Sequence, residues 1–198
     1  SKINMSKTII LEKRPDGKPQ LTDFKFTDTE LPQIGANEVL LKTSLVSVDP
    51  YLRGRMSDAK SYSAPFQLQQ PISSGIVAEV LESNNAAYTK GDYVSGLLEW
   101  KEFQKSEGKG LLKVDPAKAP LSAYLGVLGM TGLTAYLGLT EIGKPKKGET
   151  LVVSGAAGAV GSVVGQIGKL LGCRVVGIAR TDEKAEMLKA KYGFDAAI

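Results

Sequence analysis

The chain has 198 residues, of which 42% are hydrophobic and 23% charged, and its formal net charge is +4. This composition supports a folded protein with one sizeable core and excludes a disordered or fibrous chain. The sequence contains no histidine and a single cysteine, Cys173. These counts exclude an internal disulfide, a histidine-based catalytic pair and a zinc site with histidine ligands, so we expect no metal.

Membranes and nucleic acids are not expected partners. The longest apolar stretch, residues 121–139, is interrupted by polar residues and glycines and falls short of a membrane span. The basic excess is small, and Lys144, Lys146 and Lys147 form too short a run for a nucleic-acid surface. No secretory signal pattern opens the chain, so we expect a cytoplasmic location, and residues 1–4 are interpreted as a cloning remnant.

Up to about residue 120 the chain has the pattern of short strands separated by turns. Apolar or β-branched runs alternate with turn signals such as those at 15–19 and 90–92. The expected strands lie at 8–11, 39–48, 76–81 and 93–98. Their spacing predicts a small β-barrel or sandwich.

Beyond residue 120 the pattern changes to alternating helices and strands. A helix weakened by glycines is expected at 121–139, followed by a strand at 150–154 and an amphipathic helix at 160–171. A second strand is expected at 174–179, a further helix after Thr181 and the start of a third strand at 195–198. Residues 150–179 have the size of one βαβ unit. Cys173 lies between Gly172 and a buried-type strand, so we expect it to be a small core residue.

The turn between the first of these strands and its helix is rich in glycine. The pattern G-x-G-x-x-G maps onto this turn with its first glycine displaced to Gly155. Gly158 would let a pyrophosphate approach the main chain, and Gly161 would let the helix pack on the strand. The glycines could instead serve only a tight turn in another α/β protein, but the strand-turn-helix-strand context favours a dinucleotide-binding site.

The end of the second strand indicates which nicotinamide cofactor is bound. An NAD-binding unit places a carboxylate there, whereas this chain has Ala179 and Arg180. Asp182 and Glu183 come later and fit the first turn of a helix. Arg180 and Lys184 suit a 2′-phosphate, which favours NADP(H), although both side chains could also belong to a solvated helix start.

Four runs of residues, in order along the chain, resemble the zinc-independent medium-chain reductases. They are SVDPYLRGR at 47–55, LGMTGLTAY at 128–136, VSGAAGAVGSVVGQ at 153–166 and TDEK at 181–184. More narrowly, the chain is similar to the prostaglandin reductase, leukotriene B4 dehydrogenase and alkenal double-bond reductase group. The likeness extends over essentially the whole chain.

This resemblance implies an α/β architecture with two domains. A GroES-like β-barrel domain at 1–122 would precede the first part of a Rossmann-type doubly wound domain at 123–198, incomplete in this chain. Family members continue well past residue 198, so we interpret the chain as part of a longer protein, expected to be a homodimer. The chain by itself is expected to be weakly active or inactive.

Family members use NADPH to reduce the carbon-carbon double bond of α,β-unsaturated aldehydes and ketones. The resemblance assigns the cofactor pyrophosphate to Gly158, Ala159, Val160 and Gly161. It assigns the 2′-phosphate to Lys184 and the nicotinamide side to Met130 and Thr134. Hydride transfer to the β-carbon makes negative charge grow on the carbonyl oxygen, and a hydrogen-bond donor stabilises that charge. Tyr51, implied to lie at the substrate pocket, is the candidate donor.

Other interpretations of these residues and of the protein stay open. Tyr51 could be a loop aromatic held by Pro50, and Arg53 and Arg55 are expected to be structural or rim charges. A quinone reductase is the second candidate, because quinone and enone reduction share hydride transfer. From another class, the chain could be a non-catalytic NADPH-binding or scaffold protein.

Overall fold

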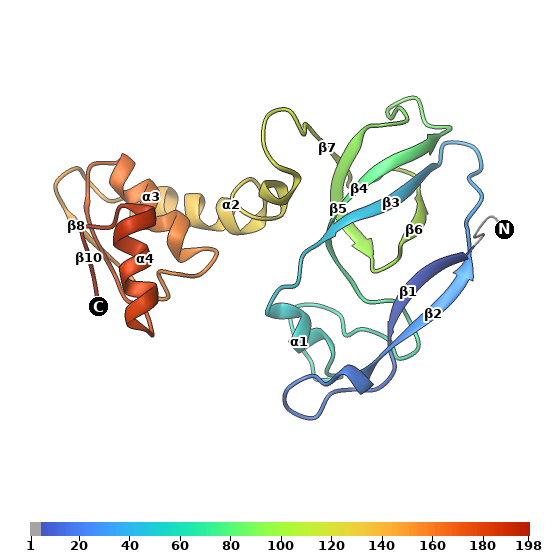
Figure 1. Ribbon diagram of the computed structural model, residues 1–198, viewed down its shortest axis with the longest axis horizontal. Helices are drawn as coiled ribbons and strands as arrows, with labels where there is room; N and C mark the ends of the chain where they lie inside the picture. The colour runs from blue at the N-terminus through green and yellow to red at the C-terminus, as the bar shows by residue number, and fades with distance from the viewer. Residues whose placement is uncertain (1–4) are drawn as a thin grey trace. The chain divides into compact units, whose positions relative to one another are not determined.

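A computed structural model describes residues 5–198; residues 1–4, interpreted above as a cloning remnant, lie outside them. Internal contacts divide the chain between Leu125 and Gly126 into two compact units (Figure 1). Within the described residues no helix is long and apolar enough to cross a membrane.

The first unit consists of antiparallel strands. Its larger sheet has the order β6-β3-β4-β5-β7, and its smaller sheet pairs β1 with β2. The strands are β1 (Met5–Leu11), β2 (Phe24–Glu30), β3 (Val39–Val46), β4 (Ser73–Ser83), β5 (Tyr93–Glu99), β6 (Phe103–Ser106) and β7 (Leu112–Val114). Three short helices, η1 (Leu21–Asp23), α1 (Tyr51–Arg55) and η2 (Leu121–Leu125), lie between or after them. The expected β-rich architecture of the first part of the chain is confirmed.

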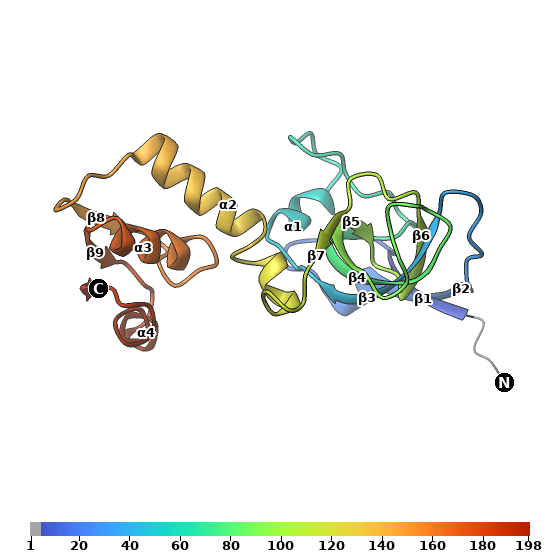
Figure 2. The same cartoon turned by 90° about the horizontal axis from the view of Figure 1, so that it is seen from above.

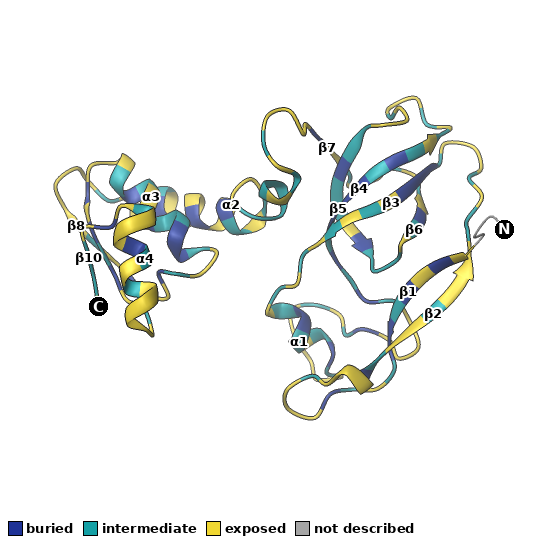
Figure 3. Cartoon of the chain, viewed as in Figure 1, coloured by how far each residue is buried: buried dark blue, intermediate teal, exposed yellow. Residues whose placement is uncertain are grey.

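Alternating apolar side chains of the three central strands form the main core of this unit. They are Val39, Leu41, Ile76, Ala78, Val80, Val94 and Leu98. This period of two is what made β3, β4 and β5 visible in the sequence. Strand β2 has no such alternation, because most of its residues are exposed and the Phe26 side chain is 70% exposed (Figure 3). Strand β2 was therefore missed, and the short strands β6 and β7 were not predicted either.

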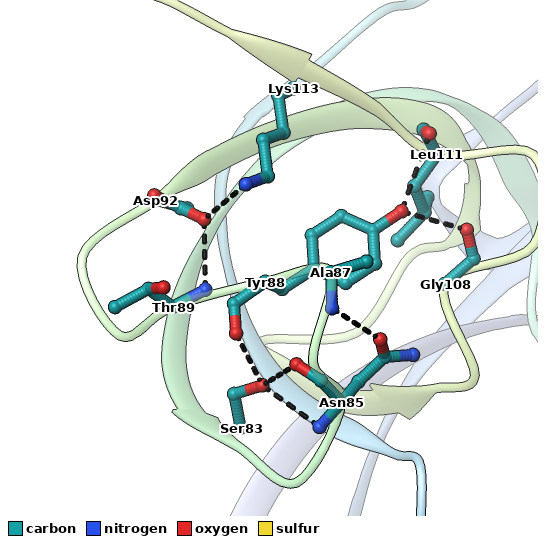
Figure 4. Close-up of polar contacts among 9 residues, drawn as sticks. All are labelled: Ser83, Asn85, Ala87, Tyr88, Thr89, Asp92, Gly108, Leu111 and Lys113. Atoms are coloured by element: carbon teal, nitrogen blue, oxygen red, sulfur yellow. Dashed lines mark hydrogen bonds and ion pairs between the residues drawn. The ribbon is translucent and has the colours of Figure 1, made fainter.

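A cluster of polar contacts around Tyr88 closes the turn between β4 and β5 (Figure 4). The Tyr88 hydroxyl donates to the Gly108 carbonyl oxygen at 2.9 Å, and the Tyr88 carbonyl oxygen accepts from the Ser83 hydroxyl at 2.7 Å. The Asp92 carboxylate accepts from the Thr89 N–H at 2.9 Å, a bond that holds the pKa of this carboxyl below its usual range. The turn expected at 90–92 is thus held in place by hydrogen bonds.

The single helix expected over 121–139 is wrong. The 3₁₀ helix η2 ends at Leu125, and the helix α2 (Met130–Leu137) starts after an extended Gly129, before a π-helical turn η3 (Gly138–Gly143). Gly132 is buried in α2, where a Cβ would run into the carbonyl group of Val127. The glycines that weakened the helical pattern therefore mark a real break, at which the chain packs back on the start of α2.

The second unit contains a parallel three-stranded sheet with the order β10-β9-β8. Its strands β8 and β9 are labelled in Figure 2. Its elements are β8 (Thr150–Val153), α3 (Gly161–Leu170), β9 (Arg174–Gly177), α4 (Asp182–Tyr192) and β10 (Ala196–Ala197). Both crossovers step along the sheet in the same direction, so α3 and α4 lie on the same face. The expected start of a parallel sheet with crossover helices is confirmed.

The fully buried residues of helix α3 are all small, and its larger Val164 is only partly buried against the core. Its buried positions are Gly161, Ser162, Gly165 and Gly168. A Cβ at Gly165 would run into the ring of Phe194, so the helix approaches its neighbours more closely than a valine or leucine face would allow. Leu170, within the amphipathic helix expected at 160–171, is 86% exposed. Cys173 is a core residue, as expected.

Candidate functional site

The glycine-rich turn joins β8 to α3 and occupies residues 154–160. Gly155 has a φ of +56°, in the left-handed region that favours glycine. The turn is closed by a hydrogen bond from the Gly158 N–H to the Gly155 carbonyl oxygen at 3.0 Å. A second bond, from the Ala156 N–H to the Ile178 carbonyl oxygen at 3.1 Å, fastens the turn to the chain just beyond β9. The backbone of the turn is therefore fixed on both sides.

Unpaired backbone N–H groups mark the start of α3. Among residues 5–198, the N–H groups of Ala159, Val160 and Gly161 have no hydrogen-bond acceptor, whereas the next one, on Ser162, donates to the Gly158 carbonyl oxygen at 3.0 Å. Ala159 is exposed. Free N–H groups at the N-terminus of a helix attract anions, and the helix dipole adds to the effect.

Two glycines of the turn differ in the room around them. A Cβ at Gly161 would lie 2.5 Å from the Gly155 carbonyl oxygen and 2.8 Å from the Ala156 Cα. A Cβ at Gly158 would have one neighbour within 4 Å, the Gly155 carbonyl oxygen at 3.3 Å. Gly161 is thus required for packing inside the protein, while the space beside Gly158 is open to a ligand.

Arg180 and Lys184 follow the carboxyl end of β9. Because β8 and β9 are parallel neighbours, this segment and the glycine-rich turn share one edge of the sheet. The Thr181 hydroxyl accepts from the Lys184 N–H at 3.3 Å and caps α4, which places Lys184 in the first turn of the helix. Both basic side chains are exposed, and neither forms an ion pair with another residue of the described range 5–198.

Met130 and Thr134 lie one turn apart on α2. The Met130 side chain is 72% exposed, and Thr134 is exposed as well. The Thr134 hydroxyl donates to the Met130 carbonyl oxygen at 2.7 Å, so its oxygen keeps lone pairs for another donor. The structure therefore places both side chains at the surface of the second unit, on the same stretch of helix.

Tyr51 is the first residue of α1, directly after Pro50. Its ring is half-buried and packs on an apolar cluster of the first unit, made of Leu11, Leu52, Met56, Phe66 and Ile72.

The phenol of Tyr51 is held in its neutral form. Burial raises its pKa above the ordinary value, and the nearby Asp49 and Tyr62 raise it further, while Arg55 acts in the opposite direction. Among residues 5–198 the hydroxyl makes no hydrogen bond to another residue, so its proton is free for a ligand. The contribution of Tyr62 was missed in the sequence, because nothing in the spacing shows that the chain after α1 turns back toward Tyr51.

Arg53 has a structural role, as expected. Its Nε donates to the Gly17 carbonyl oxygen at 2.8 Å and its Nη2 to the Pro15 carbonyl oxygen at 3.2 Å. These bonds fasten the turn that follows β1 to helix α1.

Comparison with known proteins places the chain among the oxidoreductases. Residues 7–114 match the family described as the N-terminal domain of oxidoreductase. The chain belongs to the medium-chain dehydrogenase/reductase family of NADP-dependent oxidoreductases, in the group of prostaglandin, alkenal and curcumin reductases. The resemblance stated from the sequence is confirmed.

Three relatives show how far the similarity extends. A putative NADP-dependent oxidoreductase YfmJ of Bacillus subtilis is 56% identical over 96% of this chain, and the NADPH-dependent curcumin reductase of Escherichia coli is 46% identical over 96% of it. The crystal structure of CurA with NADPH from Vibrio vulnificus matches 97% of the chain with a TM-score of 0.89 and 46% identity. The chain spans 56%, 55% and 57% of these three proteins.

Proposed function

We propose that the intact protein is an NADPH-dependent reductase of the carbon-carbon double bond in α,β-unsaturated aldehydes and ketones. The observation that carries the proposal is the open glycine-rich turn, with the free N–H groups of Ala159, Val160 and Gly161 at the start of α3. Relatives in the same group are named as NADP-dependent reductases of curcumin and of 2-alkenals, which supports this substrate class.

The residues present fit a dinucleotide phosphate. The three N–H groups and the open space beside Gly158 suit a pyrophosphate, and Arg180 and Lys184 suit a 2′-phosphate because no carboxylate occupies the end of β9. Met130 and Thr134 are proposed to contact the nicotinamide side. NADPH, when bound, supplies the hydride.

Tyr51 is proposed to act on the substrate rather than on the cofactor. Its neutral hydroxyl donates a hydrogen bond to the substrate carbonyl oxygen, and this bond strengthens as negative charge grows there. The surroundings of Tyr51 support this role, because they raise its pKa and keep the proton on the hydroxyl. We assign the substrate site to residues 1–122 and the cofactor site to residues 123–198, and the intact protein is proposed to be a homodimer.

A substrate panel tests this function. The intact protein is assayed for NADPH oxidation with 2-alkenals, with conjugated ketones and with small quinones. Turnover of alkenals and enones with little turnover of quinones is expected. Turnover of quinones alone would favour the quinone reductase, and NADPH binding without any turnover would favour a non-catalytic NADPH-binding protein. The 198-residue chain, assayed in parallel, is expected to show weak or no turnover.

A further inference from the structure

The loop after α1 is held at both ends by one arginine from another segment. Arg14 Nη1 donates to the Met56 carbonyl oxygen at 3.0 Å, and Nη2 donates to the Phe66 carbonyl oxygen at 3.1 Å. A single planar guanidinium thus bridges the residue before and the residue after the loop of residues 57–65. Loops whose ends lie this close together are Ω-loops, which are frequently functional.

Arg55 makes a second attachment to the same loop. Its Nε donates to the Ala64 carbonyl oxygen at 2.8 Å, and its guanidinium carbon lies 4.1 Å from the centre of the Phe66 ring. The Arg55 carbonyl oxygen in turn accepts from the Phe66 N–H at 2.6 Å. Among residues 5–198 neither Arg14 nor Arg55 forms an ion pair with a carboxylate, so their hydrogen bonds to protein groups go to main-chain carbonyls at the ends of this loop.

The fastened loop lies next to Tyr51. Its two flanking residues, Met56 and Phe66, belong to the apolar cluster on which the Tyr51 ring packs. Tyr62, in the middle of the loop, is 86% exposed. Both ends of the loop are therefore held at the cluster on which the Tyr51 ring packs.

We propose that Arg14 and Arg55 are positioning residues that fix the loop of residues 57–65 next to the apolar cluster on which Tyr51 packs. Together they set the surface that an unsaturated carbonyl substrate meets before hydride transfer. The proposal rests on the role assigned to Tyr51 in the proposed function. A loop that is ordered in advance does not have to lose its conformational entropy when the substrate binds, so it favours substrate binding and has no effect on NADPH binding.

Trypsin cleavage after Lys60, which lies in the exposed part of the loop, tests the positioning independently of activity. The variants are Arg14→Gln and Arg55→Gln in the 198-residue chain, with Arg53→Gln as the matched control because Arg53 bonds carbonyls of another turn. We expect Arg14→Gln and Arg55→Gln to accelerate cleavage after Lys60 about tenfold or more, since a charge-assisted bond of this kind changes an equilibrium by roughly that factor. Arg53→Gln should leave this rate near that of the wild type.

Arg14→Lys provides a milder variant in case Arg14→Gln does not fold. Lysine keeps the charge but lacks the planar fork that reaches both carbonyls, so an intermediate rate of cleavage is expected. Equal cleavage after Lys60 in all variants and the wild type would overturn the proposal.

Steady-state kinetics of the intact protein test the link to substrate. Arg14→Gln and Arg55→Gln are expected to raise KM for an enone several-fold while kcat and the Kd for NADPH stay within about twofold. A loosened loop with an unchanged KM would overturn the positioning role. Absence of turnover by the wild type would defeat the proposed function, and this proposal with it, whereas the cleavage result would still show whether the arginines hold the loop.

Discussion

Gly161 faces the carbonyl oxygen of Gly155 so closely that a Cβ at position 161 would lie 2.5 Å from that oxygen. The same carbonyl accepts the hydrogen bond from the Gly158 N–H that closes the glycine-rich turn. The start of α3 is therefore pressed against the turn, and this contact holds the free N–H groups at the edge of the sheet. Packing and ligand binding thus depend on different glycines of one motif.

Replacing Gly161 by alanine is expected to destabilise the second unit. The added methyl group would have to displace backbone atoms of Gly155 and Ala156, and overpacking of this kind costs about 1–3 kcal/mol or more. Urea unfolding followed by far-UV circular dichroism measures the effect. An unchanged unfolding midpoint would contradict the close packing of the turn.

Replacing Gly158 by alanine is expected to weaken NADPH binding with little loss of stability. A Cβ there would meet the Gly155 carbonyl oxygen at 3.3 Å, which a small backbone shift relieves, and otherwise points into open space where the pyrophosphate is proposed to lie. Fluorescence titration with NADPH, run beside the unfolding experiment, separates the two effects. If Gly158→Ala binds NADPH as the wild type does, the pyrophosphate lies elsewhere.

The sequence predicted the elements whose side chains repeat with a clear period. Strands β3, β4 and β5 contribute apolar side chains to the main core with a period of two. The stretch from β8 to β9 shows strand, glycine-rich turn, helix and strand in order. Strand β2 was missed because it has a mostly exposed surface. The break before α2 was missed because the leucine spacing across 121–139 continues through it, whereas in the structure an extended Gly129 precedes the helix.

The candidate site was predictable only where its residues belong to a local motif. The glycine-rich turn and the absence of a carboxylate at the end of β9 are local, so spacing was enough to find them. Arg14 comes from a segment far from α1 in the sequence, and its two bonds to Met56 and Phe66 depend on how the chain folds back. A hydrogen bond from an arginine to a main-chain carbonyl oxygen has no sequence pattern, because a residue of any type can supply that oxygen.

Replacing Lys184 by alanine is expected to raise the Kd for NADPH about tenfold or more and to leave the Kd for NADH nearly unchanged, since a charge-assisted pair with the 2′-phosphate is lost. Lys184 is exposed in the first turn of α4, where it pairs with no carboxylate among residues 5–198. Lys191→Ala, at the other end of the same helix, is the charge-matched control. An equal increase in the Kd for NADPH and for NADH would mean that Lys184 does not contact the 2′-phosphate and acts on the pyrophosphate or on the helix alone.

Replacing Tyr51 by phenylalanine in the intact protein is expected to lower kcat for an enone by about tenfold to a hundredfold, because a donor to the developing oxyanion is removed. The Kd for NADPH should not change. Tyr124→Phe is the control, since the Tyr124 hydroxyl donates to the Asp115 carbonyl oxygen within the first unit. An unchanged kcat in Tyr51→Phe would show that the Tyr51 hydroxyl is not the donor to the substrate carbonyl oxygen.

The pH dependence of the same reaction tests the state of the phenol. Surroundings that raise the pKa of Tyr51 keep its hydroxyl protonated up to a higher pH than that of a free tyrosine. No loss of kcat from Tyr51 is therefore expected between pH 7 and about 9, since a free tyrosine titrates near pH 10. A decline in that range that Tyr51→Phe abolishes would show that the hydroxyl ionises early.

Replacing Asp195 by asparagine is expected to destabilise the second unit at neutral pH and to have a smaller effect in acid. The Asp195 carboxylate accepts from the Val175 N–H at 2.7 Å and from Lys169 Nζ at 2.9 Å, and these bonds lower its pKa. A carboxyl whose pKa is lower in the folded state stabilises the fold above its unfolded pKa of about 4, and this contribution is lost as the pH falls through the folded value.

Urea unfolding followed by circular dichroism at pH 7, 5, 4 and 3 measures this difference between Asp195→Asn and the wild type. Other carboxyls with lowered pKa, those of Glu38 and Asp92, are present in both proteins and cancel in the comparison. Glu186→Gln, which removes an exposed ion pair with Lys189 on α4, is the control and should change little at any pH. The difference in free energy of unfolding between Asp195→Asn and the wild type should decrease as the pH falls below 4. The wild-type carboxyl then becomes protonated and loses its charge-assisted bonds. A gap that stays constant down to pH 3 would mean that Asp195 acts through its shape and not through its charge.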